Sequence, residues 1–199
     1  MNDTNDLTKL IASSTSESDY PLASRIEKNI LIYDCNPHFE RLGSAQFQSE
    51  LKIELAKALL QGPGAFVLKS AFQDTAIIDA ASSAFMSIIE KEKTSHSGGD
   101  HFAKQGINSR IWNSLQKLCE ADPQTFIRYH ANPWLQLASE AWLGPGYQMT
   151  AQVNLVRPGG AAQEGHCDYH LGFMTADHVR TYPAHVHRFS DKLTLQGAI

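Results

Sequence analysis

The chain has 199 residues, a formal net charge of −4, a pI near 6.1 and an apolar fraction of 42%. That length fits one domain or a domain with an appendage, and the apolar fraction is enough for a sizeable core. The charge balance, without a run of Lys or Arg, argues against a nucleic-acid partner. No stretch reaches the roughly 18 apolar residues needed to span a bilayer, so we expect no membrane partner.

The three cysteines, Cys35, Cys119 and Cys167, are too few and too scattered for a disulfide framework. They are typical of reduced thiols in a cytoplasmic protein. Residues 1–20 are polar and lack the apolar segment of a secretory signal. They carry too little apolar surface to offset the entropy of ordering, which predicts a disordered N-terminal arm before a folded domain over residues 21–199.

The first two thirds of the chain have helical patterns. Residues 45–61 predict an amphipathic helix, with apolar residues at every fourth position and charged residues between them. The apolar positions are Phe47, Leu51, Leu55 and Leu59, and the charged ones are Glu50, Lys52, Glu54 and Lys57. Gly62-Pro63-Gly64 should end this helix, and an apolar strand is predicted at 65–68. A second helix should run from Asp74, as N-cap, to about Lys93.

Strand patterns appear only near the end. After a polar loop at 94–108, two or three short helices are predicted over 109–143, the last of them starting at Asn132-Pro133 and ending at Gly144-Pro145. Alternating polar and apolar residues over 147–155 predict a strand. We then expect a turn at 157–160, a strand at 166–173, an irregular His-rich segment at 174–190 and a final strand from Leu193. This segregation of helices and strands indicates the α+β class.

So few strands cannot close a barrel or a two-sheet sandwich. The last strand would present an unpaired apolar edge, which natural proteins avoid. We therefore expect the chain to be the front part of a longer protein.

His166-Cys167-Asp168 is the motif that most directly indicates chemistry. On a strand, alternate side chains share a face, so His166 and Asp168 can point into one site. One imidazole and one carboxylate are two of the three ligands of the facial triad of non-haem Fe(II) oxygenases. Gln152 and Asn154 share one face of the preceding strand. Amides that face an interior need hydrogen-bond partners, such as a bound carboxylate or water.

An H-x-D pair alone is not specific. The similarly spaced His38-Phe39-Glu40 has no strand pattern around it, and we do not expect it to bind a metal. His170 shares the predicted face of His166 and is expected beside the metal rather than on it. His178, His185 and His187 are candidates for a local third ligand, and Lys104 and Arg110 are candidates for contact with an anionic substrate or cosubstrate.

Several segments together resemble the phytanoyl-CoA dioxygenase family of Fe(II)/2-oxoglutarate-dependent oxygenases. The resembling segments are 64–70 (GAFVLKS), 100–112 (DHFAKQGINSRIW), 142–147 (WLGPGY), 152–160 (QVNLVRPGG) and 163–170 (QEGHCDYH). The resemblance covers roughly residues 45–199, and the H-x-D segment with its upstream strand is its most specific part.

This resemblance implies a double-stranded β-helix (a jelly roll) with helices packed outside, of which the chain would hold the N-terminal portion. It implies that His166 and Asp168 bind Fe(II), and that Gln152 and Asn154 line the pocket for the cosubstrate 2-oxoglutarate. The family's distal His and its 2-oxoglutarate-binding Arg lie well downstream of the H-x-D, and the sequence ends at Ile199 before both. The implied reaction is hydroxylation of a small organic substrate, coupled to oxidative decarboxylation of 2-oxoglutarate.

Two other functions fit the same residues. One is a non-catalytic, truncated jelly-roll protein that retains only two ligands. The other is a Zn- or Mn-dependent hydrolase that uses His166, Asp168 and a local His. The sequence selects neither a substrate nor an oligomeric state.

Overall fold

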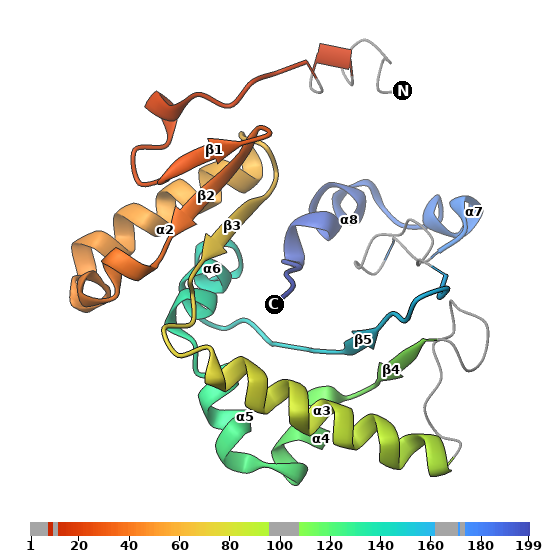
Figure 1. Cartoon of the computed structure of the whole chain (residues 1–199). Coiled ribbons are helices and arrows are strands. Elements are labelled where there is room, and N and C mark those ends of the chain that lie inside the picture. Colours follow the sequence, from red (N-terminus) through yellow and green to blue (C-terminus); the bar gives the residue numbers. More distant parts are fainter. Residues whose placement is uncertain (1–7, 10–11, 96–107, 162–170, 172–173) are drawn as a thin grey trace. The chain divides into compact units, whose positions relative to one another are not determined.

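The computed structural model describes residues 8–9, 12–95, 108–161, 171 and 174–199. Over these residues the chain combines helices with a few short strands (Figure 1), which confirms the predicted α+β class. The chain divides into two compact units. Unit 1 comprises Met1–Gln73 and Pro133–Trp142, and unit 2 comprises Asp74–Asn132 and Leu143–Ile199. None of the described helices is long and apolar enough to cross a lipid bilayer.

Unit 1 contains a three-stranded sheet. Its strands are β1 (Arg25–Glu27), β2 (Ile30–Asp34) and β3 (Phe66–Lys69), in that order. β1 and β2 are antiparallel and joined at Lys28 and Asn29, which both have positive φ as a tight hairpin turn requires. β3 lies parallel to β2, within one residue of its predicted position. β1 and β2 were not predicted, although the apolar run of β2 flanked by Asn29 is a strand signal.

Helix α2 (Ala45–Leu60) forms where the sequence predicted it. The Ser44 hydroxyl caps it by accepting from the Phe47 N–H, and it ends before Gly64, whose φ is +75°. Phe47, Leu51 and Leu55 are buried as predicted and pack with alternate residues of β2 on one face of the sheet. The burial of α2 differs from the prediction at two places: near the C-terminal end of the helix and among its charged residues. Ala58 is buried while Leu59 is only half-buried, and Glu54, predicted among the solvated charges, is 6% exposed.

Helix α6 (Pro133–Leu143) completes the core of unit 1. It begins at Pro133 and ends before Gly144, as predicted, and Gly144 has a φ of +80°. Trp134 is only 2% exposed. Its ring packs edge-on against Phe39 and Phe47, with ring centroids 5.6 and 6.4 Å apart. The core of this unit is therefore built from two segments that are far apart in the chain.

The described part of the expected N-terminal arm makes specific contacts in unit 1. The 3₁₀ turn Glu17–Asp19 precedes Tyr20, whose ring is buried in the core. Thr15 donates its hydroxyl to the Asn29 carbonyl at 2.8 Å. Lys57 on α2 lies over the Tyr20 ring, 4.8 Å from its centroid. Ordered structure therefore begins before residue 21, where we had placed the start of the folded domain.

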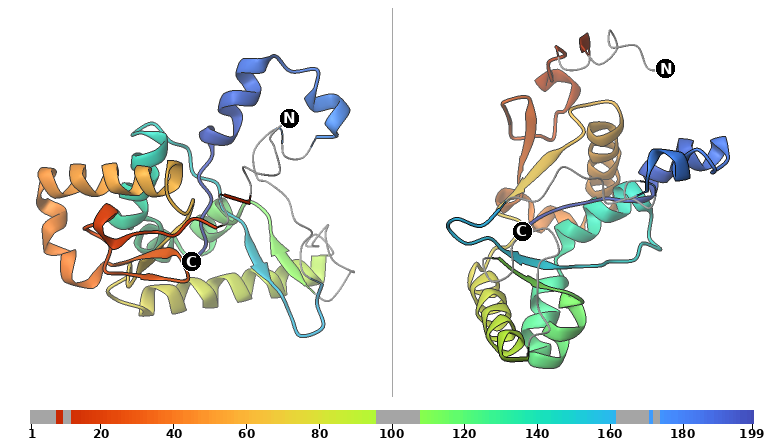
Figure 2. Two further views of the ribbon diagram at one scale, coloured as in Figure 1. Left: turned by 90° about the horizontal axis from the view of Figure 1, so that it is seen from above. Right: turned by 90° about the vertical axis from the view of Figure 1, so that its right-hand side faces the viewer.

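Unit 2 contains α3 (Ala76–Ser95), α4 (Ser114–Ala121), α5 (Pro123–His130) and the paired strands β4 (Ser109–Ile111) and β5 (Val153–Leu155). The Asp74 carboxylate accepts from the Ala76 N–H at 3.0 Å, at the predicted start of α3. Apolar residues of α3 supply most of this core, and α3 packs against β4 and α4 (Figure 2). The buried members of the core are Ala81, Phe85, Ile88 and Ile89, together with Ile111 and Leu118.

Three expectations for unit 2 are corrected. Ser109–Ile111 is a strand, although short helices were predicted from residue 109. The segment 174–190 is not irregular, because it forms α7 (Ala176–Val179) and α8 (Ala184–Phe189). The final strand from Leu193 does not form, since a 3₁₀ turn at Ser190–Leu193 is followed by residues without regular structure.

Candidate functional site

The two predicted iron ligands, His166 and Asp168, lie outside the described residues, as does His170. The chain that leads to them is described as far as Ala161. The segment that leads to them consists of β5 and the turn after it, and β5 pairs with β4 (Figure 1).

The antiparallel pairing of β4 and β5 sorts their side chains onto two faces. Ser109 lies opposite Leu155, Arg110 opposite Asn154, and Ile111 opposite Val153. Residues directly opposite each other share a face of the ladder. The apolar pair Ile111 and Val153 faces the core of unit 2, so Arg110 and Asn154 lie on the other face.

Gln152 and Asn154, the predicted cosubstrate residues, are both exposed. The predicted alternation of β5 is therefore present, but its polar face is open where we expected interior amides. The ladder covers only Val153–Leu155 of the strand predicted over 147–155. Gln152 lies just before the ladder and contacts β4 through its side chain.

Arg110 is the central residue of this polar face. Its Nη2 donates to the Gln152 Oε1 at 2.5 Å, and its guanidinium lies over the Trp112 ring, 4.2 Å from the centroid. Its Nε and Nη1 are inaccessible to solvent and have no hydrogen-bond partner among the described residues. The same is true of the Arg157 Nη2 within the described part of the chain. A buried donor without an acceptor costs about 1–3 kcal/mol, and more when it is charged, so the guanidinium of Arg110 favours an anion.

The acidic residues of α3 near this face already have cationic partners. Glu92 forms an ion pair with Lys117, and Glu90 forms one with Lys93 at 2.5 Å. The hydrogen bond from Lys93 lowers the pKa of the Glu90 carboxyl, and the Arg157 charge lowers it further. Among the described residues no carboxylate forms an ion pair with Arg110 or Arg157. Within the described part of the chain, Arg110 therefore has no carboxylate partner, whereas the charge of Arg157 acts on Glu90.

Asn108 fixes the turn that follows β5. Its side chain is 7% exposed, donates through Nδ2 to the Ala161 carbonyl at 2.9 Å, and accepts through Oδ1 from the Arg157 N–H at 3.3 Å. The predicted turn over 157–160 is confirmed, since the Gly160 N–H donates to the Arg157 carbonyl at 2.8 Å. A Cβ on Gly160 would lie 2.0 Å from the Asn108 Oδ1, so only glycine fits here. This role of Asn108 could not be predicted from the sequence, because its hydrogen bonds join residues about 50 positions apart.

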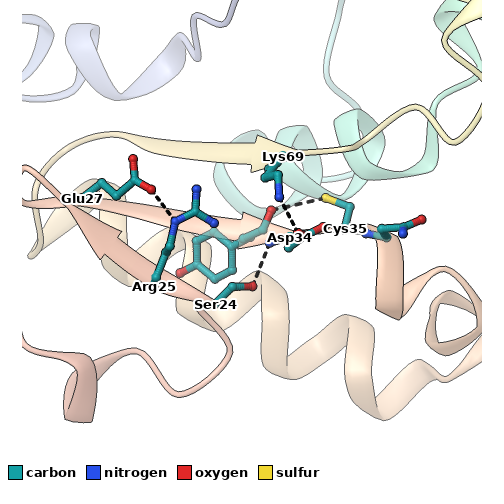
Figure 3. Close-up of polar contacts among 8 residues, drawn as sticks. Ser24, Arg25, Glu27, Asp34, Cys35 and Lys69 are labelled. Atoms are coloured by element: carbon teal, nitrogen blue, oxygen red, sulfur yellow. Dashed lines mark hydrogen bonds and ion pairs between the residues drawn. The ribbon is translucent and has the colours of Figure 1, made fainter.

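A second polar cluster lies on the sheet of unit 1 (Figure 3). The Asp34 carboxylate accepts from the Lys69 Nζ at 2.9 Å, and Arg25 pairs with Glu27 on β1. The Lys69 hydrogen bond lowers the pKa of Asp34. Ser24 adds a bond by accepting from the Asp34 N–H at 2.9 Å. Each charge in this cluster has an opposite partner, so it offers no unmatched charge to a ligand.

Cys35 lies at the end of this cluster and is 1% exposed. Burial, with a smaller contribution from the Asp34 charge, raises the pKa of its thiol to about 12. At neutral pH the group is therefore a thiol rather than a nucleophilic thiolate. The sequence predicted reduced thiols, and Cys35 is a free, buried cysteine here.

Within the described part of the chain, no three His, Cys, Asp or Glu residues are grouped so that they could hold a metal ion. His38 instead lies against the Phe47 ring, with centroids 5.7 Å apart. The candidates for a local third ligand, His178 on α7 with His185 and His187 on α8, are all exposed.

Comparison with family models, with curated proteins and with solved structures gave no match to this chain.

Proposed function

We propose that this chain belongs to an Fe(II)/2-oxoglutarate-dependent oxygenase of the phytanoyl-CoA dioxygenase type, which hydroxylates a small organic substrate. The proposal combines the H-x-D motif with the unsatisfied donors of Arg110, beside the two residues expected to line the cosubstrate pocket. It includes a double-stranded β-helix with outer helices as the complete fold, and a cytoplasmic location in keeping with the two free cysteines that the structure describes, Cys35 and Cys119.

The polar face of β4 and β5 fits the cosubstrate. 2-Oxoglutarate carries two carboxylates, which only accept hydrogen bonds, and a guanidinium only donates them. Arg binds carboxylates through paired, charge-assisted hydrogen bonds that are stronger than neutral ones. Arg110 retains two donor atoms without partners among the described residues, and Asn154 lies directly opposite on the same face. This is the single observation on which the cosubstrate assignment depends.

The donor chemistry of the motif fits ferrous iron. His166 and Asp168 would hold the metal from adjacent positions of one strand face, as two members of a facial triad. The resemblance implies that a distal His would be the third ligand and that a further Arg would help to bind 2-oxoglutarate. When bound, iron and 2-oxoglutarate would activate O₂, the oxidant: 2-oxoglutarate would supply two electrons and leave as succinate and CO₂, one oxygen atom entering succinate and the other the C–H bond of the substrate.

The described residues would prepare the site for this chemistry. Asn108 fixes the backbone from Arg157 to Ala161, five residues before His166. Arg110 would bind and partly neutralise the cosubstrate. Trp112 covers one side of the guanidinium and keeps water from it, which strengthens its attraction for an anion.

Anaerobic titration with Fe(II), in the presence and absence of 2-oxoglutarate, tests the proposal. Chelation of iron by the keto acid gives a metal-to-ligand charge-transfer band, which we expect only when both are present. His166→Ala and Asp168→Ala should abolish the band, because each leaves an incomplete triad. His38→Ala and Glu40→Ala remove the same functional groups at the same spacing in unit 1 and should leave it unchanged.

The protein should also convert 2-oxoglutarate to succinate in air, and both ligand variants should stop this reaction. A band or a turnover rate that survives in both His166→Ala and Asp168→Ala would refute the metal assignment. Turnover of a hydrolysable ester without 2-oxoglutarate, supported by Zn²⁺ or Mn²⁺, would favour the hydrolase.

A further inference from the structure

We propose that Gln152 is a positioning residue, which orients the guanidinium of Arg110 so that Arg110 binds the carboxylate of the cosubstrate. This inference rests on the proposed function and changes the role expected for Gln152. The sequence placed Gln152 in direct contact with 2-oxoglutarate, whereas its carbonyl oxygen is hydrogen-bonded to Arg110.

The first argument is the direction of the hydrogen bond. A glutamine side chain has one carbonyl oxygen as acceptor and one NH₂ group as donor. The Gln152 Oε1 accepts from the Arg110 Nη2 at 2.5 Å, so the acceptor end of the amide is directed at the guanidinium. A carboxylate ligand has no hydrogen to donate and could not replace Arg110 at that oxygen.

The second argument is the geometry left at Arg110. The Trp112 ring, 4.2 Å from the Arg110 Cζ, fixes the plane of the guanidinium, and Gln152 fixes its rotation within that plane. A guanidinium has two pairs of N–H donors, or forks, that can each bind both oxygens of a carboxylate: Nε with Nη2, and Nη1 with Nη2. Nη2 contributes one hydrogen to each fork. Donation of one of them to Gln152 leaves the other fork, with Nε or Nη1, for a carboxylate. Both of these atoms lack partners among the described residues.

The third argument is that the two residues are held by different strands. Arg110 belongs to β4, while Gln152 precedes β5, and the ladder between these strands sets their separation. A long, flexible Arg side chain loses rotamer entropy when it binds a ligand, and a partner that orders it beforehand reduces this cost. Gln152 therefore acts on affinity through Arg110, without a contact of its own.

A double-mutant cycle on the full chain tests this inference. The measured quantity is the Kd of 2-oxoglutarate by calorimetry, with Mn(II) as a redox-inert replacement for iron. Gln152→Met keeps the length of the side chain and removes the acceptor, and should weaken binding roughly 2- to 12-fold. Arg110→Lys keeps the charge and loses the fork, and should weaken binding roughly 10-fold or more. Gln152→Met should add nothing further in the Arg110→Lys background.

Two further variants define the controls. Gln152→Glu places a carboxylate where the amide was and should compete with the ligand for Arg110, so it should weaken binding more than Gln152→Met does. Gln116→Met makes the same substitution on the exposed surface of α4, where Gln116 bonds Glu120, and should leave the Kd unchanged. The midpoint of thermal unfolding should be the same for both Met variants, which separates lost orientation from lost folding.

The outcomes separate the inference from the proposed function. Failure of the unsubstituted protein to bind 2-oxoglutarate would overturn both. An Arg110→Lys variant with unchanged affinity would overturn the inference and the cosubstrate role of Arg110, but not the metal assignment, which the Fe(II) titration tests. If Arg110→Lys weakens binding but Gln152→Met weakens it by the same factor in both backgrounds, Gln152 contacts the ligand directly and only the positioning role is refuted.

Discussion

The buried Glu54 carboxylate allows a quantitative test of how unit 1 is held together. Its Oε1 accepts from the Tyr33 hydroxyl at 3.0 Å, and its two oxygens accept from the Leu22 N–H at 3.2 and 3.1 Å. Glu54 on α2 therefore binds both β2 and the segment that precedes β1. The same contact affects the phenol, because burial and the neighbouring Glu54 raise the pKa of Tyr33 well above its usual value.

Replacing Glu54 with Ala leaves the buried Tyr33 hydroxyl and the part-buried Leu22 N–H without an acceptor. Each such donor costs about 1–3 kcal/mol, so Glu54→Ala should lower the free energy of unfolding by about 2–6 kcal/mol. Glu54→Gln should cost less than about 1.5 kcal/mol, because the amide oxygen can accept from Leu22 and the NH₂ can donate to the Tyr33 oxygen. Adding Tyr33→Phe to Glu54→Ala should restore part of the lost free energy of unfolding, since it removes the Tyr33 hydroxyl that Glu54→Ala leaves without an acceptor.

Urea unfolding followed by circular dichroism provides the measurement. Glu50→Ala is the control, because Glu50 is exposed one turn earlier on α2 and bonds only Gln46 among the described residues. That change should stay within about 0.5 kcal/mol. Equal transition midpoints for Glu54→Ala and Glu50→Ala would refute the reasoning, because a buried acceptor and a solvated one would then contribute alike.

Three further predictions concern other described residues. Cys35, with a thiol pKa of about 12, should be alkylated by iodoacetamide at pH 8 far more slowly than the half-buried Cys119, and mass spectrometry that finds equal rates would contradict this. Asp122 caps α5, and hydrogen bonds from the Thr125 side chain and backbone lower its carboxyl pKa below the ordinary 3.8. The stabilisation is therefore present above that value and is lost as the pH falls through the lowered one, so Asp122→Ala should reduce the unfolding midpoint at pH 7 and reduce it progressively less as the pH is lowered below 3.8. Gly62→Ala should cost roughly 1–3 kcal/mol, because its Cβ would lie 2.9 Å from a backbone carbonyl of α2. Gly43→Ala, where nothing lies within 4 Å, should be nearly neutral in the same urea titration.

The sequence predicted the long helices well because their signals are local. The four-residue spacing of Phe47, Leu51 and Leu55 and the breakers after them define α2, and Gly144 ends α6 as expected. Short elements were less predictable. α7 and α8 have four and six residues, too few for an apolar stripe to show, and they fell in a segment predicted to be irregular.

The polar residues were the least predictable, since their environment is set by distant parts of the chain. Glu54 has the same charge as Glu50 and looked equally solvated, yet Leu22 and Tyr33 surround it in the fold. The sequence predicted Gln152 and Asn154 on one side of a strand, and that strand forms. The hydrogen bond from Arg110 to Gln152 could not be predicted, because the two residues are 42 positions apart in the chain. The H-x-D pair itself stays a prediction.

The discontinuity of unit 1 affects how the protein is made. Trp134 lies between Phe39 and Phe47 in the finished core, but it is translated about sixty residues after Gln73, the last residue of the first segment. At about 5–20 residues per second, a ribosome would take several seconds to supply it. During that interval the emerging chain would expose the apolar faces of α2 and β2, and a chaperone that binds nascent chains would find its site there.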